Sequence, residues 1–253
     1  MERPDNILQS CIDTGESKIK KTLEAKLILG FVGGAMISLG YLAYIKIAAT
    51  IPESLGGLGS FLGACVFPVG LIVILLAGGE LVTGNMMVVS AALLDKKISL
   101  GDWIKNILTI TLANAVGALF VAYVFGHIVG LTAGEVYGHE TALLAEGKLN
   151  ASYLQCFFSG MGCNWLVGLS VWLCYGAKGS SGKILAIWFP IMTFVLIGFQ
   201  HSVANIFLLA AAIFEGYITW FDFIQNLIPV YLGNIAGGMV FVALFYYRSY
   251  RNH

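Results

Sequence analysis

The sequence predicts an all-α integral membrane protein whose six transmembrane helices form two inverted repeats of three helices. Three observations predict this fold: an apolar composition, long apolar runs and a weak internal repeat. Of the 253 residues, 58% are hydrophobic and 11% are charged, whereas a soluble domain carries about 25% charged residues. Apolar runs this continuous are typical of membrane helices and exclude the alternating pattern of a β-barrel.

The apolar residues group into six runs, and about 20 such residues are enough to cross the hydrocarbon layer. The runs cover approximately 27–48, 60–94, 106–131, 152–175, 184–213 and 227–247. The second and fifth runs are too long for one straight helix, and both have polar residues in the middle. We therefore expect both of these helices to be broken.

The expected organisation follows from these runs. Residues 1–26 form a cytoplasmic N-terminal arm, 27–131 the first three-helix repeat, and 132–151 an extracytoplasmic loop. Residues 152–247 form the second, inverted three-helix repeat, and 248–253 a cytoplasmic tail.

The N-terminal arm is polar and does not have the short apolar region of a signal peptide. Ile7, Leu8, Cys11 and Ile12 recur at helical spacing, which is typical of a short helix lying on a membrane surface. The alternative is a solvated tail. If the arm is helical, we expect it to act as a pH-dependent plug at the cytoplasmic mouth.

Basic residues are distributed unevenly between the two sides of the predicted membrane. With six spans, both termini share one side, and this side carries 12 of the 14 Lys and Arg residues. Only Lys46 and Lys148 lie on the other side. Because basic residues concentrate in cytoplasmic loops, we expect a multi-pass protein of the cell (inner) membrane with both termini in the cytoplasm.

An internal repeat relates the two halves of the chain. The segment DWIKNILTITLANAVG from Asp102 aligns with DFIQNLIPVYLGNIAG from Asp222 at an offset of 120 residues, with six of sixteen positions identical. A Phe-Pro pair at residues 67–68 recurs at residues 189–190. Each half has three spans, so the second half enters the membrane from the opposite side, as in transporters built from inverted repeats.

Polar segments interrupt the second and fifth runs at matching places in the two halves: GGELVTGN in the first and GFQHSVAN in the second. Non-helical backbone is tolerated at membrane depth only where it is buried in protein or lines a wet cavity. Each break also exposes a helix N-terminus, which attracts anions. We expect Thr83 and Ser202 to be the N-caps of the half-helices that follow. The alternative is that both breaks are only kinks packed against neighbouring helices.

His201 is the most informative polar residue in the breaks. An intramembrane histidine indicates a functional site, and histidine can exchange a proton near neutral pH. The alternative is a core histidine held by one hydrogen bond to a facing helix. Thr83 in the other break is a suitable partner in both cases, and we expect Glu80 to cap N–H groups of its own break.

Two further residues, Asn164 and Lys148, stand out in and before the fourth run. Asn164 is an amide among glycines in the span, where asparagine usually forms hydrogen bonds between helices. Lys148 precedes this span on the cation-poor side, where it either attracts anions to an entrance or is an ordinary surface lysine. The five cysteines form no C-x-x-C pair and four lie within spans, so we predict no metal site, and we predict no cofactor.

The segments LLAGGELVTG and GMGCNWLVG resemble the two signature motifs of the formate–nitrite transporter family. The six-span topology and the length agree with this resemblance along nearly the whole chain. The resemblance implies an aquaporin-like fold, with each protomer of a homopentamer containing its own pore. The implied partners are small anions and membrane lipid, with no nucleic acid.

The resemblance also implies roles for individual residues. Thr83 and His201 meet at the pore centre together with Asn164, and Lys148 attracts anions at the entrance. The implied apolar constrictions are formed by Phe67, Leu71, Leu81, Val82, Val167 and Phe194.

Three departures from the family motifs concern the substrate. Val82 stands where the first motif prefers phenylalanine or isoleucine, and Gly168 and Ser170 stand where the second prefers cysteine and alanine. These departures are similar to the hydrosulfide-channel branch of the family. We therefore expect a channel or transporter for weak-acid anions, hydrosulfide and/or formate with nitrite as a further substrate, and not an enzyme.

Three alternatives belong to other classes of protein. An aquaporin-like channel for neutral solutes shares the inverted repeat, but it would have an Asn-Pro-Ala tripeptide in each break, and neither break contains proline. A membrane enzyme would need a nucleophile–base pair or a metal cluster. A receptor or scaffold would not need two matching breaks with ionisable residues.

Overall fold

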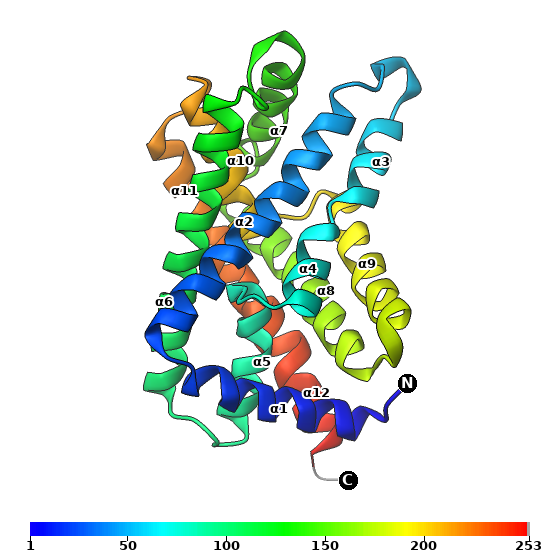
Figure 1. The fold of residues 1–253 in the computed structure, drawn as a ribbon, viewed down its shortest axis with the longest axis vertical. Helices are drawn as coiled ribbons and strands as arrows, with labels where there is room; N and C mark the ends of the chain where they lie inside the picture. Colours follow the sequence, from blue (N-terminus) through cyan, green and yellow to red (C-terminus); the bar gives the residue numbers. More distant parts are fainter. Residues whose placement is uncertain (252–253) are drawn as a thin grey trace.

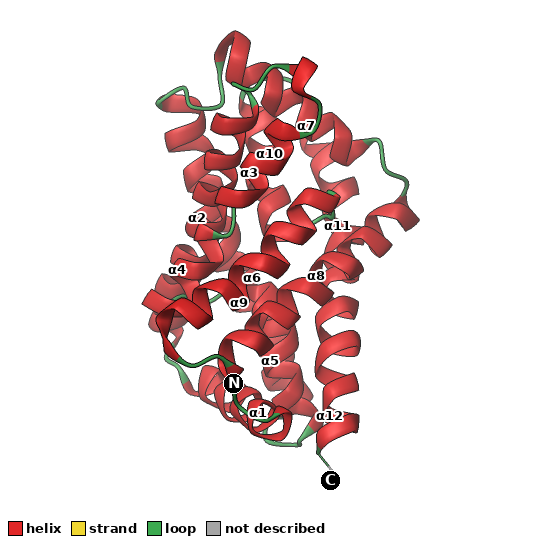
Figure 2. Cartoon of the chain, turned by 90° about the vertical axis from the view of Figure 1, so that its right-hand side faces the viewer, coloured by secondary structure: helices red, strands yellow, loops and turns green. Residues whose placement is uncertain are grey.

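A computed structural model describes residues 1–251, apart from the side chain of residue 53, and every element in this part of the chain is a helix (Figure 2). The helices are α1 (Pro4–Lys20), α2 (Leu23–Ala48), α3 (Leu58–Val66), α4 (Val69–Ala77), α5 (Val82–Leu94), α6 (Leu100–Phe120), α7 (His139–Leu149), α8 (Tyr153–Gly176), α9 (Gly179–Ile197), α10 (Ser202–Phe214), α11 (Trp220–Ala236) and α12 (Phe245–Tyr250). Wider π-helical turns continue α6 over Val121–Ile128 and α11 over Gly237–Leu244. A short 3-10 turn, Glu53–Leu55, follows α2.

Six helical segments of the described chain are long and apolar enough to cross a membrane, which agrees with the prediction. Their bounds are Leu23–Ala48, Leu58–Ala77, Leu100–Ile128, Tyr153–Gly176, Gly179–Ile197 and Trp220–Tyr250. The third and sixth begin earlier than the apolar runs indicate. Ser99 and Thr219 each form a reciprocal capping box with the aspartate three residues later, and this arrangement stabilises a helix start within a polar segment.

The chain is not helical at residues 78–81 or at residues 198–201, which separate α4 from α5 and α9 from α10. Each segment begins at a glycine with positive φ, 108° at Gly78 and 86° at Gly198. This backbone conformation strains other residues. The two short helices that follow, α5 and α10, have 13 residues each and are almost entirely buried.

The two ends of the molecule differ (Figure 1). Both chain termini and α1 lie at one end, which we call the terminal end, and α7 lies at the opposite, far end. Most of residues 132–151, the predicted extracytoplasmic loop, is helical: a π-helical turn, Gly134–Gly138, leads into α7.

The N-terminal arm forms α1, which crosses the terminal end beneath α5 (Figure 1). The four apolar residues at helical spacing, Ile7, Leu8, Cys11 and Ile12, are at most 2% exposed and pack against α5, α8 and the end of the chain. Their partners include Met87, Val88, Ala91, Trp172 and Val242. The predicted apolar face is thus present, but it is covered by protein rather than by a membrane surface, and the alternative of a solvated tail is wrong. Residues 252–253 of the predicted tail lie outside the described residues.

Candidate functional site

An asparagine holds each non-helical segment in place. Asn114 accepts a hydrogen bond from the Val82 N–H (2.8 Å) and donates to the carbonyls of Glu80 (2.8 Å) and Gly30 (2.7 Å). Asn114 is completely buried, so it satisfies backbone groups that would otherwise be left unpaired at the break.

Asn234, 120 residues later, makes the same three contacts in the other break. It accepts from the Ser202 N–H (2.8 Å) and donates to the carbonyls of Gln200 (3.1 Å) and Gly160 (2.8 Å). The amide side chains thus occupy the first free N–H groups of α5 and α10.

This arrangement corrects the predicted N-caps. Thr83 and Ser202 lie within the helices, and the cap positions are occupied by Leu81 and His201. The Nδ1 atom of His201 accepts a hydrogen bond from the Ala204 N–H (3.1 Å). The sequence argument placed the helix starts one or two residues too late because it did not include caps supplied by a distant asparagine.

The structure brings His201 and Thr83 together, as predicted from the two breaks. His201 Nε2 lies 2.9 Å from Thr83 Oγ1, and both residues are buried. Because Nδ1 accepts from a backbone N–H, we assign the ring proton of the neutral imidazole to Nε2, which then donates to Thr83. A second ring proton would point at the Ala204 N–H, so this geometry favours a neutral histidine.

An apolar barrier surrounds this pair. The rings of Phe67 and Phe194 meet edge to face with centroids 5.8 Å apart, and Phe194 stacks on His201 at 5.9 Å. Leu71 and Leu81 continue the barrier toward the terminal end and are at most 4% exposed. Four of the six predicted constriction residues therefore border a cavity, Phe67 and Phe194 one and Leu71 and Leu81 another.

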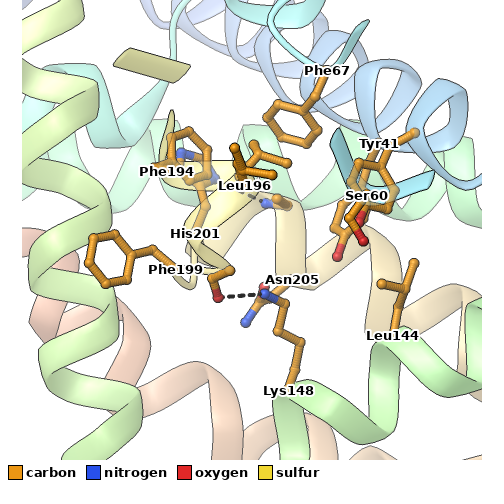
Figure 3. Close-up of a pocket in the computed structure, with 14 residues that line it drawn as sticks. Tyr41, Ser60, Phe67, Leu144, Lys148, Phe194, Leu196, Phe199, His201 and Asn205 are labelled. Atoms are coloured by element: carbon orange, nitrogen blue, oxygen red, sulfur yellow. Dashed lines mark hydrogen bonds between the residues drawn. The ribbon is translucent and has the colours of Figure 1, made fainter. Parts of the chain in front are cut away.

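On the far side of the barrier lies a cavity of about 160 Å³ lined by Phe67, Phe194, His201 and Lys148 (Figure 3). Lys148 extends from α7 toward the break that carries His201, and its Nζ donates to the Gly198 carbonyl at 3.0 Å. Burial lowers the pKa of Lys148 from its ordinary value. Lys148 is thus a component of the cavity rather than a surface lysine.

On the terminal side lies a smaller cavity of about 20 Å³, which Leu71 and Leu81 border together with Lys18 of α1. Lys18 forms an ion pair with the buried Glu80 carboxylate at 2.7 Å, and Lys21 forms a second at 3.0 Å. Asn85 also donates to Glu80 (2.9 Å). We expected Glu80 to cap N–H groups of its own break, and this prediction is wrong. The Glu80 carboxylate instead binds two lysines and so holds the N-terminal arm against the break.

The remaining predicted site residues are buried but border neither cavity. Val82 and Val167 are at most 1% exposed and belong to the apolar core. Asn164 donates to the carbonyls of Asn234 (2.7 Å) and Thr83 (3.2 Å). Asn164 thus fixes the backbone that carries the Thr83 hydroxyl, and its own Oδ1 is buried without a partner.

Sequence reasoning missed a cluster of polar side chains behind each break. In the first cluster, Asn85 donates to Glu80 and to Asn106 Oδ1 (3.0 Å). In the second, Asn205 donates to Gln200 Oε1 (2.7 Å) and to Asn226 Oδ1 (2.8 Å). The members of the two clusters are 120 residues apart, so extending the repeat beyond residues 102–117 would have found them.

The described side chains contain no group of three His, Cys, Asp or Glu residues arranged to hold a metal ion. The described residues contain instead a buried His201–Thr83 pair, with one cavity bordered by His201 and a second bordered by Leu81. Together with six apolar helices, this arrangement defines a multi-pass membrane protein with a buried polar site between two cavities.

The chain belongs to the formate/nitrite transporter family, because the model of this family matches residues 5–248. It is 53% identical over 248 residues to the uncharacterized transporter YrhG of Bacillus subtilis (strain 168), covering 98% of this chain and 93% of that protein. It is 50% identical over 249 residues to the formate channel BtFdhC of Bacillus thuringiensis, covering 98% of this chain and 96% of that protein.

Solved structures have the same fold. One, described as an FNT family ion channel, matches with a TM-score of 0.88 and 28% identity over 96% of this chain and 98% of the other. Another, a pentameric formate channel with formate bound, matches with a TM-score of 0.79 and 27% identity over 91% of this chain and 98% of the other.

Proposed function

We propose that this protein is a channel or transporter for small monovalent weak-acid anions, with formate as the first substrate to test. The observation that carries the proposal is the closed apolar barrier that contains the His201–Thr83 pair and separates a lysine-lined cavity from the terminal end. The similarity to the formate channel of Bacillus thuringiensis supports formate. The departures at Val82, Gly168 and Ser170 favour hydrosulfide as a further substrate, and nitrite is a third.

The mechanism has to avoid placing a bare anion in the apolar barrier, where its desolvation would be costly. Lys148 attracts the anion into the far cavity. There the weak acid takes up a proton from a hydronium ion in the cavity while His201 stays neutral, and the neutral acid passes between Phe67 and Phe194. The neutral tautomer of His201 supports passage of the neutral acid over a mechanism in which a permanently charged imidazolium binds the anion.

Thr83 has a defined part in this mechanism. Its Oγ1 accepts the Nε2 proton of His201, so its own hydroxyl proton is free to donate to an oxygen or sulfur atom of the substrate. Asn164 fixes the backbone carbonyl of Thr83, which keeps the hydroxyl aimed at the histidine.

Flux into proteoliposomes containing the purified protein tests this function. Formate, hydrosulfide, nitrite and glycerol are compared for the wild type and for His201→Asn, with His127→Asn as a matched control, because His127 pairs with Glu215 away from the barrier. We expect the anions to pass, His201→Asn to lose or reshape the selectivity, and His127→Asn to behave like the wild type. Passage of glycerol alone, with His201→Asn unchanged, would show instead an aquaporin-like channel for neutral solutes.

We propose that the two groups of three spans form an inverted repeat with broken second and fifth helices. The matched contacts of Asn114 and Asn234 support this, and so do the capping boxes that begin α6 and α11. With three spans in each half, the two non-helical segments approach the barrier from opposite ends.

We also propose that the terminal end faces the cytoplasm of the cell and that the protein assembles as a homopentamer in the membrane. The excess of basic residues at the terminal end supports the orientation. The pentameric formate channel supports the assembly. Tags at the N-terminus and at the C-terminus of the chain test the orientation, because a protease outside vesicles removes only tags that face outward. The mass of the complex in detergent tests the number of subunits.

A further inference from the structure

In both polar clusters behind the breaks, one asparagine donates to the side chain five residues before it and to a second asparagine on the next long helix. The clusters differ in that Asn226 also donates to Gln200 Oε1 (2.8 Å), whereas the Asn106 amide N–H group has no partner in the described part of the chain. They also differ in one side chain. Glu80 in the first cluster and Gln200 in the second occupy equivalent positions, 120 residues apart, and each accepts a hydrogen bond from the asparagine five residues later. Both side chains are at most 3% exposed. One cluster therefore contains a carboxylate where the other contains a neutral amide.

Each cluster lies next to a lysine that lines a cavity, and the two lysines differ accordingly. Lys18 is bound to the Glu80 carboxylate. Lys148 has no carboxylate partner among the described side chains, and its Nζ donates to the carbonyl of Gly198. An ammonium group that is already paired with a carboxylate attracts a third ion much less than an unpaired one, because the two charges nearly cancel at a distance.

Gln200 is in direct contact with Lys148. Its Nε2 donates to the Lys148 carbonyl (3.3 Å), and Asn226 donates to the same carbonyl (3.1 Å). Its Oε1 accepts from Asn205, which lines the far cavity together with Lys148 (Figure 3). A carboxylate at position 200 would therefore lie directly behind the cavity wall.

We propose that Gln200 determines substrate affinity at the far mouth: its neutral amide leaves the Lys148 ammonium uncompensated, so that the far cavity concentrates monovalent anions. This inference rests on the proposed anion transport and adds a residue to it. Gln200 acts through Lys148 and the wall of the cavity, and it does not touch the substrate.

The other titratable groups around the far cavity are two tyrosines, one histidine, two cysteines and one glutamate. Tyr41 and Tyr44 of α2 and His201 line the cavity. Glu140, two turns before Lys148 on α7, acts electrostatically on these two tyrosines.

The side chains that act electrostatically on Lys148 are Cys156 and Cys163 of α8. Both are free, buried thiols, and burial disfavours the charged thiolate. The Cys156 sulfur accepts hydrogen bonds from Gln200 (3.4 Å) and Asn226 (3.6 Å).

The test introduces a carboxylate near Lys148 in two independent ways. Gln200→Glu places it in the cluster, with Gln200→Met as the neutral control. Leu144→Glu places it on α7, one turn before Lys148 and on the cavity wall, with Leu144→Gln as the neutral control. The second pair does not alter the break, so it gives a result even where Gln200→Glu does not fold.

Formate uptake is measured in proteoliposomes sorted by orientation with a C-terminal affinity tag, so that formate enters from the far end. We expect both glutamate variants to raise the KM for formate about three- to tenfold at low salt, with less change in the maximal rate. Each neutral control raises the KM less than the matching glutamate variant, and about 0.5 M salt removes most of the difference between the two.

Several results would overturn the inference. The first is a KM for formate in Gln200→Glu equal to that of the wild type. The second is an equal rise of this KM in Gln200→Met, and the third is a rise in Gln200→Glu that salt does not reduce. Where Gln200→Glu does not fold, an unchanged KM in Leu144→Glu has the same meaning. If the wild type passes no anion at all, the proposed function itself is wrong, and this outcome is distinct because it appears before any variant is compared.

Discussion

Residues 78–85 and residues 198–205 share several structural features but carry different side chains. Each begins at a glycine with positive φ, is pinned by an asparagine from a long helix, and leads into a buried 13-residue helix. The first segment then holds a lysine-bound carboxylate and Leu81, and the second holds an amide and His201 at the equivalent places. The backbone framework is shared by the two halves, whereas the charged and proton-exchanging groups are specific to each.

The largest effect is expected when this framework is removed. Asn114→Leu leaves the Val82 N–H and the Glu80 carbonyl without partners, and each buried unpaired group costs about 1–3 kcal/mol. We expect a loss of stability of about 2–6 kcal/mol, measured as a large drop of the melting temperature in detergent. Asn234→Leu should cost about the same. A large difference between the two variants would mean that the two breaks do not depend on equivalent frameworks.

Removing the charge that distinguishes the first break has the next largest effect. Glu80→Gln leaves Lys18 and Lys21 without their carboxylate, and breaking a buried ion pair costs about 3–5 kcal/mol where the remaining charge stays buried. Because α1 can move away and expose its lysines, we expect a smaller global loss and a detached arm.

Hydrogen exchange of residues 4–20 measures this detachment, and we expect it to accelerate at least tenfold in Glu80→Gln while α10 is unchanged. If α1 instead acts as a pH-dependent plug, deletion of residues 1–20 raises the flux at low pH. Unchanged exchange in Glu80→Gln would show that apolar packing of α1 suffices to hold it.

The pH dependence of transport reports on the charge of Lys148, which lies beside the second break. Burial lowers the pKa of Lys148 from 10.5, so its positive charge is lost at a lower pH than that of an exposed lysine. Since the charged form attracts the anion, we expect the KM for formate entering from the far end to rise as the pH increases, starting below pH 10.5.

In Gln200→Glu the added carboxylate stabilises the ammonium, so this rise moves to higher pH. Formate is fully ionised throughout the range, and its own titration does not interfere. If the KM for formate depends on pH in the same way in the wild type and in Gln200→Glu, residue 200 does not affect the charge of Lys148.

The smallest effect is expected where the two halves meet. Thr111 and Tyr231, again 120 residues apart, share a hydrogen bond of 2.6 Å between their hydroxyl groups. Tyr231→Phe removes this one partly buried bond and should cost about 0.5–1.5 kcal/mol. Thr111→Val also removes the hydrogen bond from Thr111 to the Ile107 carbonyl (2.7 Å), so it should cost somewhat more, and the double variant should cost little more than Thr111→Val alone. Fully additive losses would indicate that the two hydroxyl groups act independently.

The sequence predicts the spans and the two breaks, because apolar length and a polar interruption are local signals. It predicts the meeting of Thr83 with His201 only because the two breaks occupy matching places in the internal repeat. It also identifies Lys148 and four of the barrier residues, through the resemblance to a family. It does not predict that Asn114 rather than Thr83 caps α5, because that contact joins residues 32 positions apart. The sequence does not predict the ion pairs of Glu80 with Lys18 and Lys21 for the same reason. The helical spacing of the N-terminal arm predicts an apolar face but not the part of the molecule against which this face packs.

The carbonyl of Lys148 has a consequence for mutagenesis at the far mouth. Gln200 and Asn226 both bind this main-chain oxygen, and every amino acid placed at position 148 keeps it. Replacing the side chain therefore abolishes the charge and the Nζ hydrogen bond to the Gly198 carbonyl, but it leaves both hydrogen bonds to the main-chain oxygen in place. A shift of register, such as deleting one residue between 139 and 147, would remove these main-chain hydrogen bonds while retaining the lysine. Substitutions at position 148 thus leave the main-chain attachment of α7 in place, and its contribution becomes visible only when the chain length is altered.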